Sequence, residues 1–505
     1  MGVAVMDLIA NLLLGLSVSL SPDNLLLCFG GALIGTLIGV LPGLGPTATV
    51  AMLLPLTFYL PPVGALIMLA GIFYGSQYGG SATAILVNLP GESSSVVTCL
   101  DGHAMARQGR AGVALATAAL ASLFAGIATT FLIAVAGPPL AGVALAFGPA
   151  EYVSLMLLGL IGAVTLAHGS VVKAIAMILL GLLLSMVGTD VNSGDTRFTF
   201  GLPQLYDGID FVPLAMGLFG LAEIIISLEQ TGGVGRTTAP IASLWPKRED
   251  VRQAWPATVR GTVMGALLGI LPGGGATLGS FAAYSLEKKV SRHPERFGQG
   301  AIEGVAAPEA ANNAASQACF IPMLSLGIPP NAIMALMIGA MTIHGITPGP
   351  QIMVKQPELF WGMIASMLIG NVILVILNLP MIGLWVRLLR VPYGYLFPAI
   401  LVFCCIGTYT LNNSAFNVLL MALFGVLGYV LRKLDCEPAP LMLGFVLGPL
   451  LEENLGRALL LSGGDPTVFA TRPISGGLLA VAALLLLVMV MPAVRRRRDE
   501  AFQDE

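Results

Sequence analysis

A series of apolar runs, each long enough to cross a lipid bilayer as a helix, most constrains what this chain can fold into. A helix needs roughly 20 apolar residues to span the hydrocarbon core. The clearest runs are residues 111–135, 151–166, 171–187, 211–228, 360–386 and 476–491. Only 10% of the residues are charged, against about 25% in a soluble domain. We therefore expect an all-α polytopic membrane protein with about 12 transmembrane helices.

Glycine and proline are frequent inside these apolar stretches rather than in polar linkers. The chain has 62 Gly and 33 Pro. Within a bilayer, a broken helix persists only where its freed backbone groups face protein or a wet cavity. The pattern thus indicates a transporter or a channel. Residues 1–20 lack a basic n-region and a small-residue cleavage site, so we expect a retained transmembrane helix there.

The most informative pattern is an internal repeat. Residues 35–47 read GTLIGVLPGLGPT and residues 265–277 read GALLGILPGGGAT, identical at 8 of 13 positions. A second polar segment broken by Gly and Pro follows each copy, at 78–95 and at 312–331. The chain therefore consists of two halves derived from one ancestral unit.

Loop charges predict that the two halves have opposite orientations, because Lys and Arg stay on the cytoplasmic side. No basic residue flanks the first LPG segment, whereas several flank the second: Lys247, Arg248, Arg252, Arg260, Lys288, Lys289, Arg292 and Arg296. We expect two re-entrant helical hairpins that enter from opposite faces, within two inverted-topology repeats typical of secondary transporters. Counting the crossings between the other basic loops places both termini on the cytoplasmic side. We expect the membrane to be a bacterial inner membrane.

These patterns divide the chain into five segments. They are an N-terminal transmembrane helix (1–20); a first inverted repeat (21–135) with a hairpin (24–60) and a broken helix (64–106); connecting helices (136–250) with an acidic outside loop (190–209); a second inverted repeat (251–390) with a hairpin (255–287) and a broken helix (298–345); and C-terminal helices with a basic cytoplasmic tail (391–505).

The hairpin tips are the predicted anion site. A half-helix that begins at Thr47 or Thr277 turns unpaired N–H groups and a positive dipole end toward the tip, which suits a carboxylate. The alternative is that the glycines only allow close helix packing. The predicted substrate-binding residues are Gly43, Gly45, Thr47, Ser81, Asn88, Gly273, Gly275, Thr277, Pro329 and Asn331.

Neutral polar groups in the same segments are the predicted cation site, because hydroxyl and amide oxygens suit Na⁺. These are Thr47, Ser81, Thr277, Asn312, Asn313 and Ser316. Glu92 and Glu309 are alternative proton sites, since an acid at membrane depth is a functional candidate. The other interpretation is that Glu92 is solvated in a loop and Glu309 caps a helix or pairs with a base. We expect no other metal, because the six cysteines lack metal-ligand spacing.

Enzymatic and nucleic-acid functions are not expected. The chain has no G-x-x-x-x-G-K-[ST], H-E-x-x-H or G-x-S-x-G motif. The sequence therefore gives no indication of nucleotide hydrolysis, zinc proteolysis or serine hydrolysis. The basic residues are scattered over short loops, which is unlike a nucleic-acid surface.

With these segments in hand, the chain resembles the large permease subunit of the tripartite tricarboxylate transporters, the TctA-like family. The resemblance covers about residues 23–472. It rests on GVLPGLGPTATVAMLLPLTF and YGGSATAILVNLPGESSSVVTCLDGHAMARQGRAG in the first half, and on GILPGGGATLGSF, EGVAAPEAANNAASQ, LGIPPNA and IHGITPGPQ in the second.

The resemblance implies a partner system and a substrate class. The partners would be a small TctB-like membrane subunit and a periplasmic, TctC-like solute-binding protein. The substrate would be a citrate-like tricarboxylate or dicarboxylate, imported by symport with Na⁺ or H⁺ through alternating access of an elevator type, with no cofactor. A stand-alone carrier or channel for another small solute, working without a binding protein, is the alternative.

Overall fold

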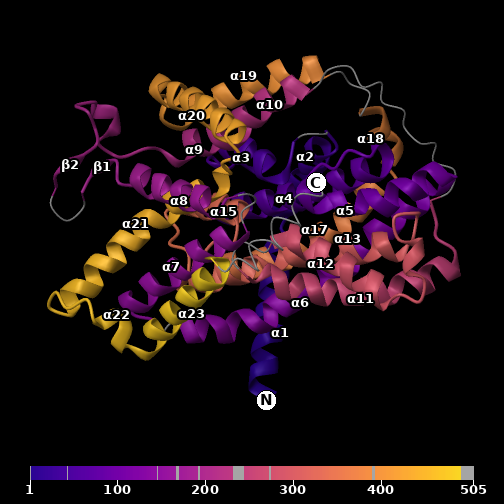
Figure 1. The fold of residues 1–505 in the computed structure, drawn as a ribbon, viewed down its shortest axis with the longest axis horizontal. Helices are drawn as coiled ribbons and strands as arrows, with labels where there is room; N and C mark the ends of the chain where they lie inside the picture. Colours follow the sequence, from indigo (N-terminus) through magenta and orange to yellow (C-terminus); the bar gives the residue numbers. More distant parts are fainter. Residues whose placement is uncertain are drawn as a thin grey trace.

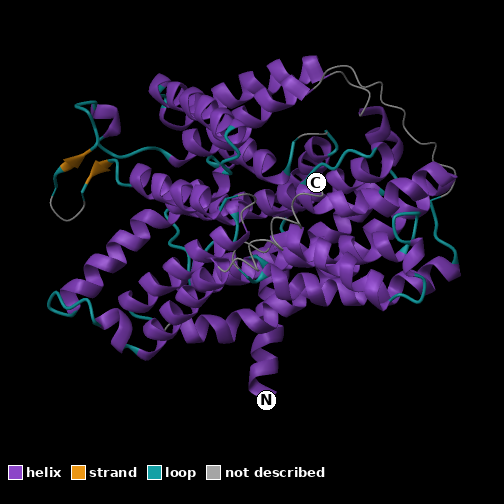
Figure 2. Ribbon diagram, viewed as in Figure 1, coloured by secondary structure: helices purple, strands orange, loops and turns teal. Residues whose placement is uncertain are grey.

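The computed structural model describes residues 2–41, 44–144, 146–166, 170–190, 194–230, 244–271, 275–388 and 393–490. The described part is almost entirely helical (Figure 2), which confirms the predicted all-α class. Its single sheet is a small antiparallel pair, β1 (Gly188–Thr189) with β2 (Thr196–Arg197). This pair lies in and beside the predicted acidic loop, where we expected no regular structure.

Several of the described helices are long and apolar enough to cross a membrane. By length and composition there are five: Pro22–Gly39, Ala106–Val143, Phe211–Glu229, Pro357–Asn378 and Ala415–Lys433. Seven shorter apolar helices accompany them. The protein is therefore a multi-pass membrane protein, and the expected number of 12 crossings stays a prediction.

The helices follow one another in a similar order along the chain in the two repeats. Helix α1 (Gly2–Ser19) extends away from the body of the molecule (Figure 1) and leads into the first repeat. That repeat contains α2 (Pro22–Gly39), α3 (Pro46–Thr57), α4 (Pro62–Val87), η1 (Ser93–Ser95), α5 (Val96–Thr98), η2 (Cys99–His103), η3 (Ala106–Arg110) and α6 (Ala111–Ala144). The second contains α11 (Arg248–Gly269), α12 (Gly275–Val290), η6 (Pro294–Arg296), α13 (Glu303–Ala318), α14 (Phe320–Leu326), α15 (Ala332–Ile343), α16 (Gln351–Lys355), α17 (Pro357–Asn378) and α18 (Ile382–Leu388).

The remaining helices connect the repeats or follow them. Between the repeats lie α7 (Pro149–Leu166), α8 (Val171–Ser185), η4 (Pro203–Leu205), α9 (Phe211–Ala215), η5 (Met216–Leu221) and α10 (Ala222–Gln230). After them come α19 (Tyr393–Asn412), α20 (Ala415–Lys433), α21 (Pro438–Leu461), α22 (Val468–Thr471) and α23 (Pro473–Val490). In Figure 1, α2, α5, α11, α12 and α13 lie to the right, α3 and α4 lie near the centre, and α7, α8 and α21–α23 lie to the left.

Within each repeat, one hairpin arm packs against the broken helix through glycines spaced four residues apart. A Cβ on Gly35 of α2 would collide with the backbone of Ile72 in α4, and a Cβ on Gly265 of α11 with the backbone of Ala311 in α13. The same contacts recur one turn away on each side, at Gly31 and Gly39 and at Gly261 and Gly269. Small residues at this spacing let helix backbones approach closely in a membrane. These six glycines therefore serve close helix packing, and the tip glycines, for which we weighed that role, are not among them.

The breaks that follow α4 and α14 have matching backbone conformations. Asn88 ends α4 at φ 57°, and Gly327 ends α14 at φ 74°. Four residues later, Glu92 and Asn331 are extended, with φ −153° and −152°, and each precedes a new helical segment. The two broken helices thus have the same shape at equivalent positions, although one uses Asn and the other Gly for the left-handed residue.

A buried carboxylate joins the two repeats at one end of the molecule. Asp101, in η2, is fully buried. Its Oδ1 accepts hydrogen bonds from the backbone N–H groups of Gly298 (2.9 Å), Gly300 (2.8 Å) and Ala301 (2.8 Å). Its Oδ2 accepts one from the Tyr284 hydroxyl at 2.9 Å. The carboxylate therefore holds the loop before α13 against the first repeat, which offsets the cost of its burial.

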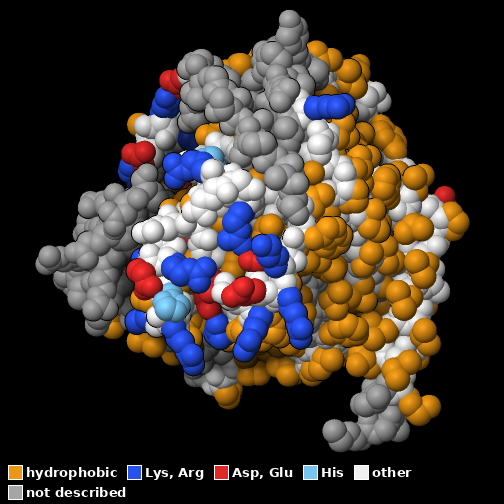
Figure 3. Space-filling model, turned by 90° about the vertical axis from the view of Figure 1, so that its right-hand side faces the viewer, with side chains coloured by type: hydrophobic (Ala, Val, Ile, Leu, Met, Phe, Trp, Pro, Cys, Tyr) orange, Lys and Arg blue, Asp and Glu red, His pale blue; other side chains and the backbone are white. Residues whose placement is uncertain are grey.

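Basic side chains gather near this end. Figure 3 shows Lys and Arg side chains clustered on one part of a face whose other part is a broad apolar surface. Exposed basic residues of the segments around Asp101 include Arg107, Lys288, Lys289 and Arg292. Charged loops beside an apolar surface are the arrangement expected where a protein leaves the bilayer.

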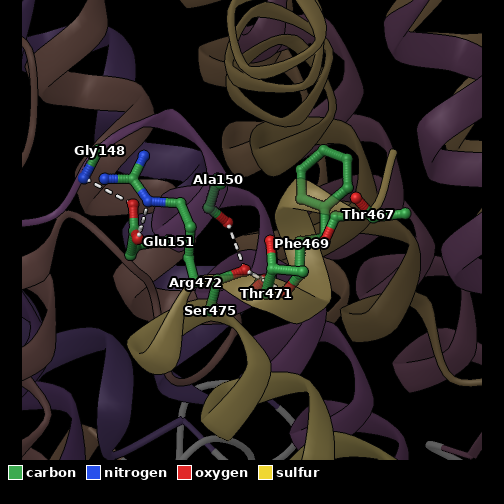
Figure 4. A network of polar contacts seen from close by, with 9 residues as sticks. Gly148, Ala150, Glu151, Thr467, Phe469, Thr471, Arg472 and Ser475 are labelled. Carbon is green, nitrogen blue, oxygen red and sulfur yellow. Dashed lines mark hydrogen bonds and ion pairs between the residues drawn. The ribbon is translucent and has the colours of Figure 1, made fainter. Parts of the chain in front are cut away.

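The C-terminal helices are fastened to α7 by an ion pair between the exposed Arg472 and the buried Glu151 (Figure 4). Arg472 Nε lies 2.9 Å from Glu151 Oε1, and Glu151 Oε2 accepts a hydrogen bond from the Gly148 N–H. The Ser475 hydroxyl lies 2.7 Å from that of Ser154 and donates to the Phe469 carbonyl. These contacts fix α22 and α23 on α7.

Candidate binding site

Both hairpin tips and both broken segments line a single cavity of about 580 Å³. From the tips come Gly45, Thr47, Gly275 and Thr277, at the starts of α3 and α12. From the breaks come residues 90–94 and 330–333. The repeated motifs therefore meet in space although they are far apart in the sequence.

Hydrogen bonds between the two halves close the wall of this cavity. The hydroxyls of Ser93 and Thr277 lie 2.7 Å apart. Asn312 Nδ2 donates to Glu92 Oε1 at 2.8 Å. The break of the first repeat is therefore held both by the tip and by the broken helix of the second repeat.

The two broken helices also touch through equivalent residues. Gln77 of α4 lies at the cavity, as does Ser316 of α13, and Gln77 Nε2 donates to Ser316 Oγ at 2.5 Å. The same number of residues separates Asn88 from Gly327 and Glu92 from Asn331. The same separation relates Gln77 to Ser316, so the two residues are equivalent and their hydrogen bond joins matching positions of the two halves.

Of the predicted site residues, seven line the cavity. They are Gly45, Thr47, Glu92, Gly275, Thr277, Ser316 and Asn331. Asn331 Oδ1 accepts from the Met334 N–H, so the side chain also caps α15. Gly43 and Gly273 lie outside the described residues.

The other predicted residues lie elsewhere. Asn312 reaches the cavity wall only through Glu92, while Asn313 Oδ1 accepts from Gln317 Nε2 at 3.1 Å inside the helix packing. Asn88 is an exposed helix-ending residue, and Pro329 is buried in the turn of the second break. Ser81 and Glu309 line a second, smaller cavity.

Several cavity residues come from helices outside the repeats and were not predicted. Among the described residues of the wall, Arg432 of α20 is the single basic side chain, and its Nη1 lies 2.5 Å from Oε2 of Glu223 in α10. Phe219 of η5 and Leu443 of α21 add apolar surface. Glu223 lies in the apolar run 211–228, so the rule for acids at membrane depth would have found it. No comparable signal marked Arg432, which reads as a loop charge.

Comparisons with known proteins agree with the family resemblance drawn from the motifs. A model of the "Tripartite tricarboxylate transporter TctA family" matches residues 25–443. One relative, the "Uncharacterized 52.8 kDa protein in TAR-I ttuC' 3'region" of Agrobacterium vitis, is 57% identical over 500 residues, which cover 99% of this chain and all of the relative. A second, the "Uncharacterized protein in TAR-II ttuC' 3'region" of the same organism, is 57% identical over 241 residues, 48% of this chain and all of the relative. No solved structure matches the chain.

Proposed function

Because the chain belongs to the tripartite tricarboxylate transporter TctA family, it is a permease of that type, and we propose that it imports a citrate-like tricarboxylate or dicarboxylate by cation symport. It would work in a bacterial inner membrane with both termini in the cytoplasm. Its proposed partners are a small membrane subunit and a periplasmic solute-binding protein.

The observation that carries the proposal is the cavity lined by both tips and both breaks. Its volume lies within the range of about 300–1,000 Å³ that is usual for small-molecule sites. The tips lie where α3 and α12 begin, and N-terminal N–H groups favour anions. We assign the substrate carboxylates to this region, with Gly45, Thr47, Gly275, Thr277 and Asn331 around them.

One basic side chain on the wall, Arg432, suits an anionic substrate, and it lies among the carboxyl groups of Glu92, Glu223 and Glu437. Arg432 can bind a carboxylate through its guanidinium fork. In the present arrangement it is paired with Glu223. A substrate carboxylate that reached Arg432 would compete with Glu223 for the same donor.

Coupling to a cation needs oxygen ligands near this site. Thr47, Thr277 and Ser316 supply hydroxyls on the cavity wall, and Asn312 contacts it through Glu92. Ser81 and Asn313 lie deeper in the helix packing. Glu92 and Glu309 are the groups that would carry a proton if H⁺ replaced Na⁺ as the coupling ion.

Two separate groups of helices form the cavity wall, which supports alternating access of an elevator type. One side belongs to the repeats, and the other to η5, α10, α20 and α21. We propose that the repeat elements bearing the tips move as a unit against the other helices. Arg432 and Glu437 lie at the loop between α20 and α21, which loop charges place in the cytoplasm. The described conformation would therefore be the inward-facing one.

Transport is tested in proteoliposomes that contain the chain and its small membrane subunit, with the purified binding protein added outside. Uptake of labelled tricarboxylates and dicarboxylates is measured with and without an inward Na⁺ gradient, and separately with a proton gradient. We expect uptake that requires the binding protein and one of the two gradients. Uptake that ignores the binding protein would instead support a stand-alone carrier.

A further inference from the structure

A second, smaller cavity lies between the two repeats and is lined by residues of both α4 and α13. Its volume is about 20 Å³, and a water molecule needs about 10–15 Å³ measured in this way. Helices α4, α6, α13, α17 and α18 all contribute to its wall. The space therefore fits one water molecule or one small ion.

Four oxygen-bearing side chains line this small cavity: Tyr78, Ser81, Glu309 and Asn378. All four are more than nine-tenths buried. Asn378 Oδ1 has no hydrogen-bond partner, and the Ser81 hydroxyl beside Glu309 and the Tyr78 hydroxyl beside Ser122 make no well-formed hydrogen bond. Native proteins rarely leave buried polar atoms unpaired unless a water or an ion meets them. Three poorly paired atoms around one cavity indicate an occupant that binds to oxygen.

The charge of Glu309 identifies the kind of occupant. Its Oε1 accepts a hydrogen bond from Thr98 Oγ1 at 2.6 Å, and the described residues include no basic side chain that pairs with it. A buried carboxylate without a counter-charge is costly. A cation in the adjacent cavity would supply the missing charge, and carboxylate, hydroxyl and amide oxygens are the ligands of hard cations.

We propose that this second cavity binds a dehydrated Na⁺ ion, held by the Glu309 carboxylate and by the oxygens of Tyr78, Ser81 and Asn378. The site lies seven residues before Ser316 on α13, which is about 10 Å along the helix axis. It touches both repeats through α4 and α13. Its occupancy would therefore affect how the two broken helices pack beside the larger cavity. Only this coupling to transport rests on the proposed function, because ion binding itself does not.

Trp385 lines the same cavity and gives a readout that does not depend on transport. The purified protein is titrated with NaCl at fixed pH, with N-methylglucamine chloride keeping the ionic strength constant. We expect a saturable, Na⁺-specific change in tryptophan fluorescence that Trp385→Phe removes. We also expect a higher unfolding temperature in Na⁺, because an ion that binds only the native state stabilises it.

Helix α17 offers a matched pair of variants. Asn371 and Asn378 both donate Nδ2 to the carbonyl four residues earlier, at 2.7 and 2.8 Å, and both have an unpaired Oδ1. Only Asn378 lines the cavity. Asn378→Ala and Glu309→Gln should raise the half-saturating Na⁺ concentration by about tenfold or more, and Asn371→Ala should leave it unchanged. Ser81→Ala serves if either site variant does not fold.

Three results would overturn the proposal. They are the absence of any Na⁺-specific change in the parent protein, equal effects of the two Asn variants, and a response to pH alone that Glu309→Gln abolishes. The last result would assign the cavity to a proton. Na⁺ binding without carboxylate uptake would refute the proposed function and leave this site standing. Na⁺-independent carboxylate uptake with no Na⁺ binding would refute this site and leave the proposed carboxylate transport standing.

Discussion

Gln77 and Ser316 hydrogen-bond to each other although 239 residues separate them, with Gln77 Nε2 2.5 Å from Ser316 Oγ. They occupy equivalent positions in the broken helices of the two repeats. An axis that relates the halves would pass close to this bond. Equivalent residues of the two halves therefore meet beside the cavity, and the opposite orientation of the two repeats stays a prediction.

Opposite entry of the two hairpins can be tested by cysteine labelling. Tyr59 lies just after the end of α3 and is 69% exposed, and Lys289, in the last turn of α12, is also exposed. In intact cells, Tyr59→Cys should react with an impermeant maleimide, whereas Lys289→Cys should react only after lysis. Thr57 is a poorer probe because it is buried. Labelling of both sites in intact cells would contradict antiparallel repeats.

The anion role of the tips predicts that Gly45→Leu abolishes substrate binding in a protein that still folds. A Cβ at Gly45 would meet only the Gly91 carbonyl, at 3.6 Å, so the added side chain projects into free space of the cavity. Isothermal titration with carboxylates measures the loss. Gly275 is a weaker test, because its φ of +45° disfavours any side chain.

Gly30→Leu is the matched control for this tip variant. Gly30 lies on the same hairpin, away from the cavity, and a Cβ there meets nothing within 4 Å. It should bind substrate like the parent protein. If Gly45→Leu also bound normally, the first tip would not be a binding element.

The Arg432–Glu223 pair predicts that the two partners affect carboxylate affinity differently. Arg432→Gln should weaken carboxylate binding about 10–100-fold, because a hydrogen bond to a charged group contributes about 1.5–3 kcal/mol. Glu223→Gln should leave affinity unchanged or increase it, since Arg432 loses its competitor. Equilibrium binding of the purified protein checks both.

Lys433→Gln controls for the loss of a positive charge, because Lys433 pairs with Glu229 and does not line the cavity. Its affinity should match that of the parent. A purely structural role for the Arg432–Glu223 pair would instead lower the unfolding temperature equally in Arg432→Gln and Glu223→Gln, with no difference in affinity between them.

The contacts of Asp101 predict a graded loss of stability. Asp101→Ala leaves three backbone N–H groups without an acceptor, at about 1–3 kcal/mol for each group that stays buried and unpaired. Tyr284→Phe removes a single bond to the same carboxylate and should cost about 1 kcal/mol. Thermal unfolding in detergent ranks the two variants, and equal effects would show that the backbone contacts add nothing.

The internal sequence repeat determined which residues of the site could be predicted. The LPGxGxT motif appears twice, so it identified Thr47 and Thr277 without knowledge of the fold, and both line the cavity. Nothing repeats around Arg432 or Asn378. Their importance depends on which helices pack beside the repeats, and long-range packing leaves no local signal in one sequence.

Polar residues inside apolar segments were the other useful signal. They indicated that a side chain lies at membrane depth, but not which cavity or helix it contacts. Asn312 and Asn313 are neighbours on α13, yet one bonds to Glu92 and the other lies within the helix packing. In the sequence, Asp101 lies close to His103, Arg107 and Arg110, a pattern typical of a solvated loop. Its burial depends on three N–H groups from the other half of the chain, which no pattern near residue 101 announces.

The position of Asp101 also has a consequence for how the protein is made. The last of its backbone donors, Ala301, is synthesised 200 residues later. At about 5–20 residues per second, the ribosome needs about 10–40 s to reach it. During that interval the carboxylate has no protein partner from the second half and must stay in contact with water. The contacts of Asp101 with the second half therefore form only after the loop before α13 has been translated.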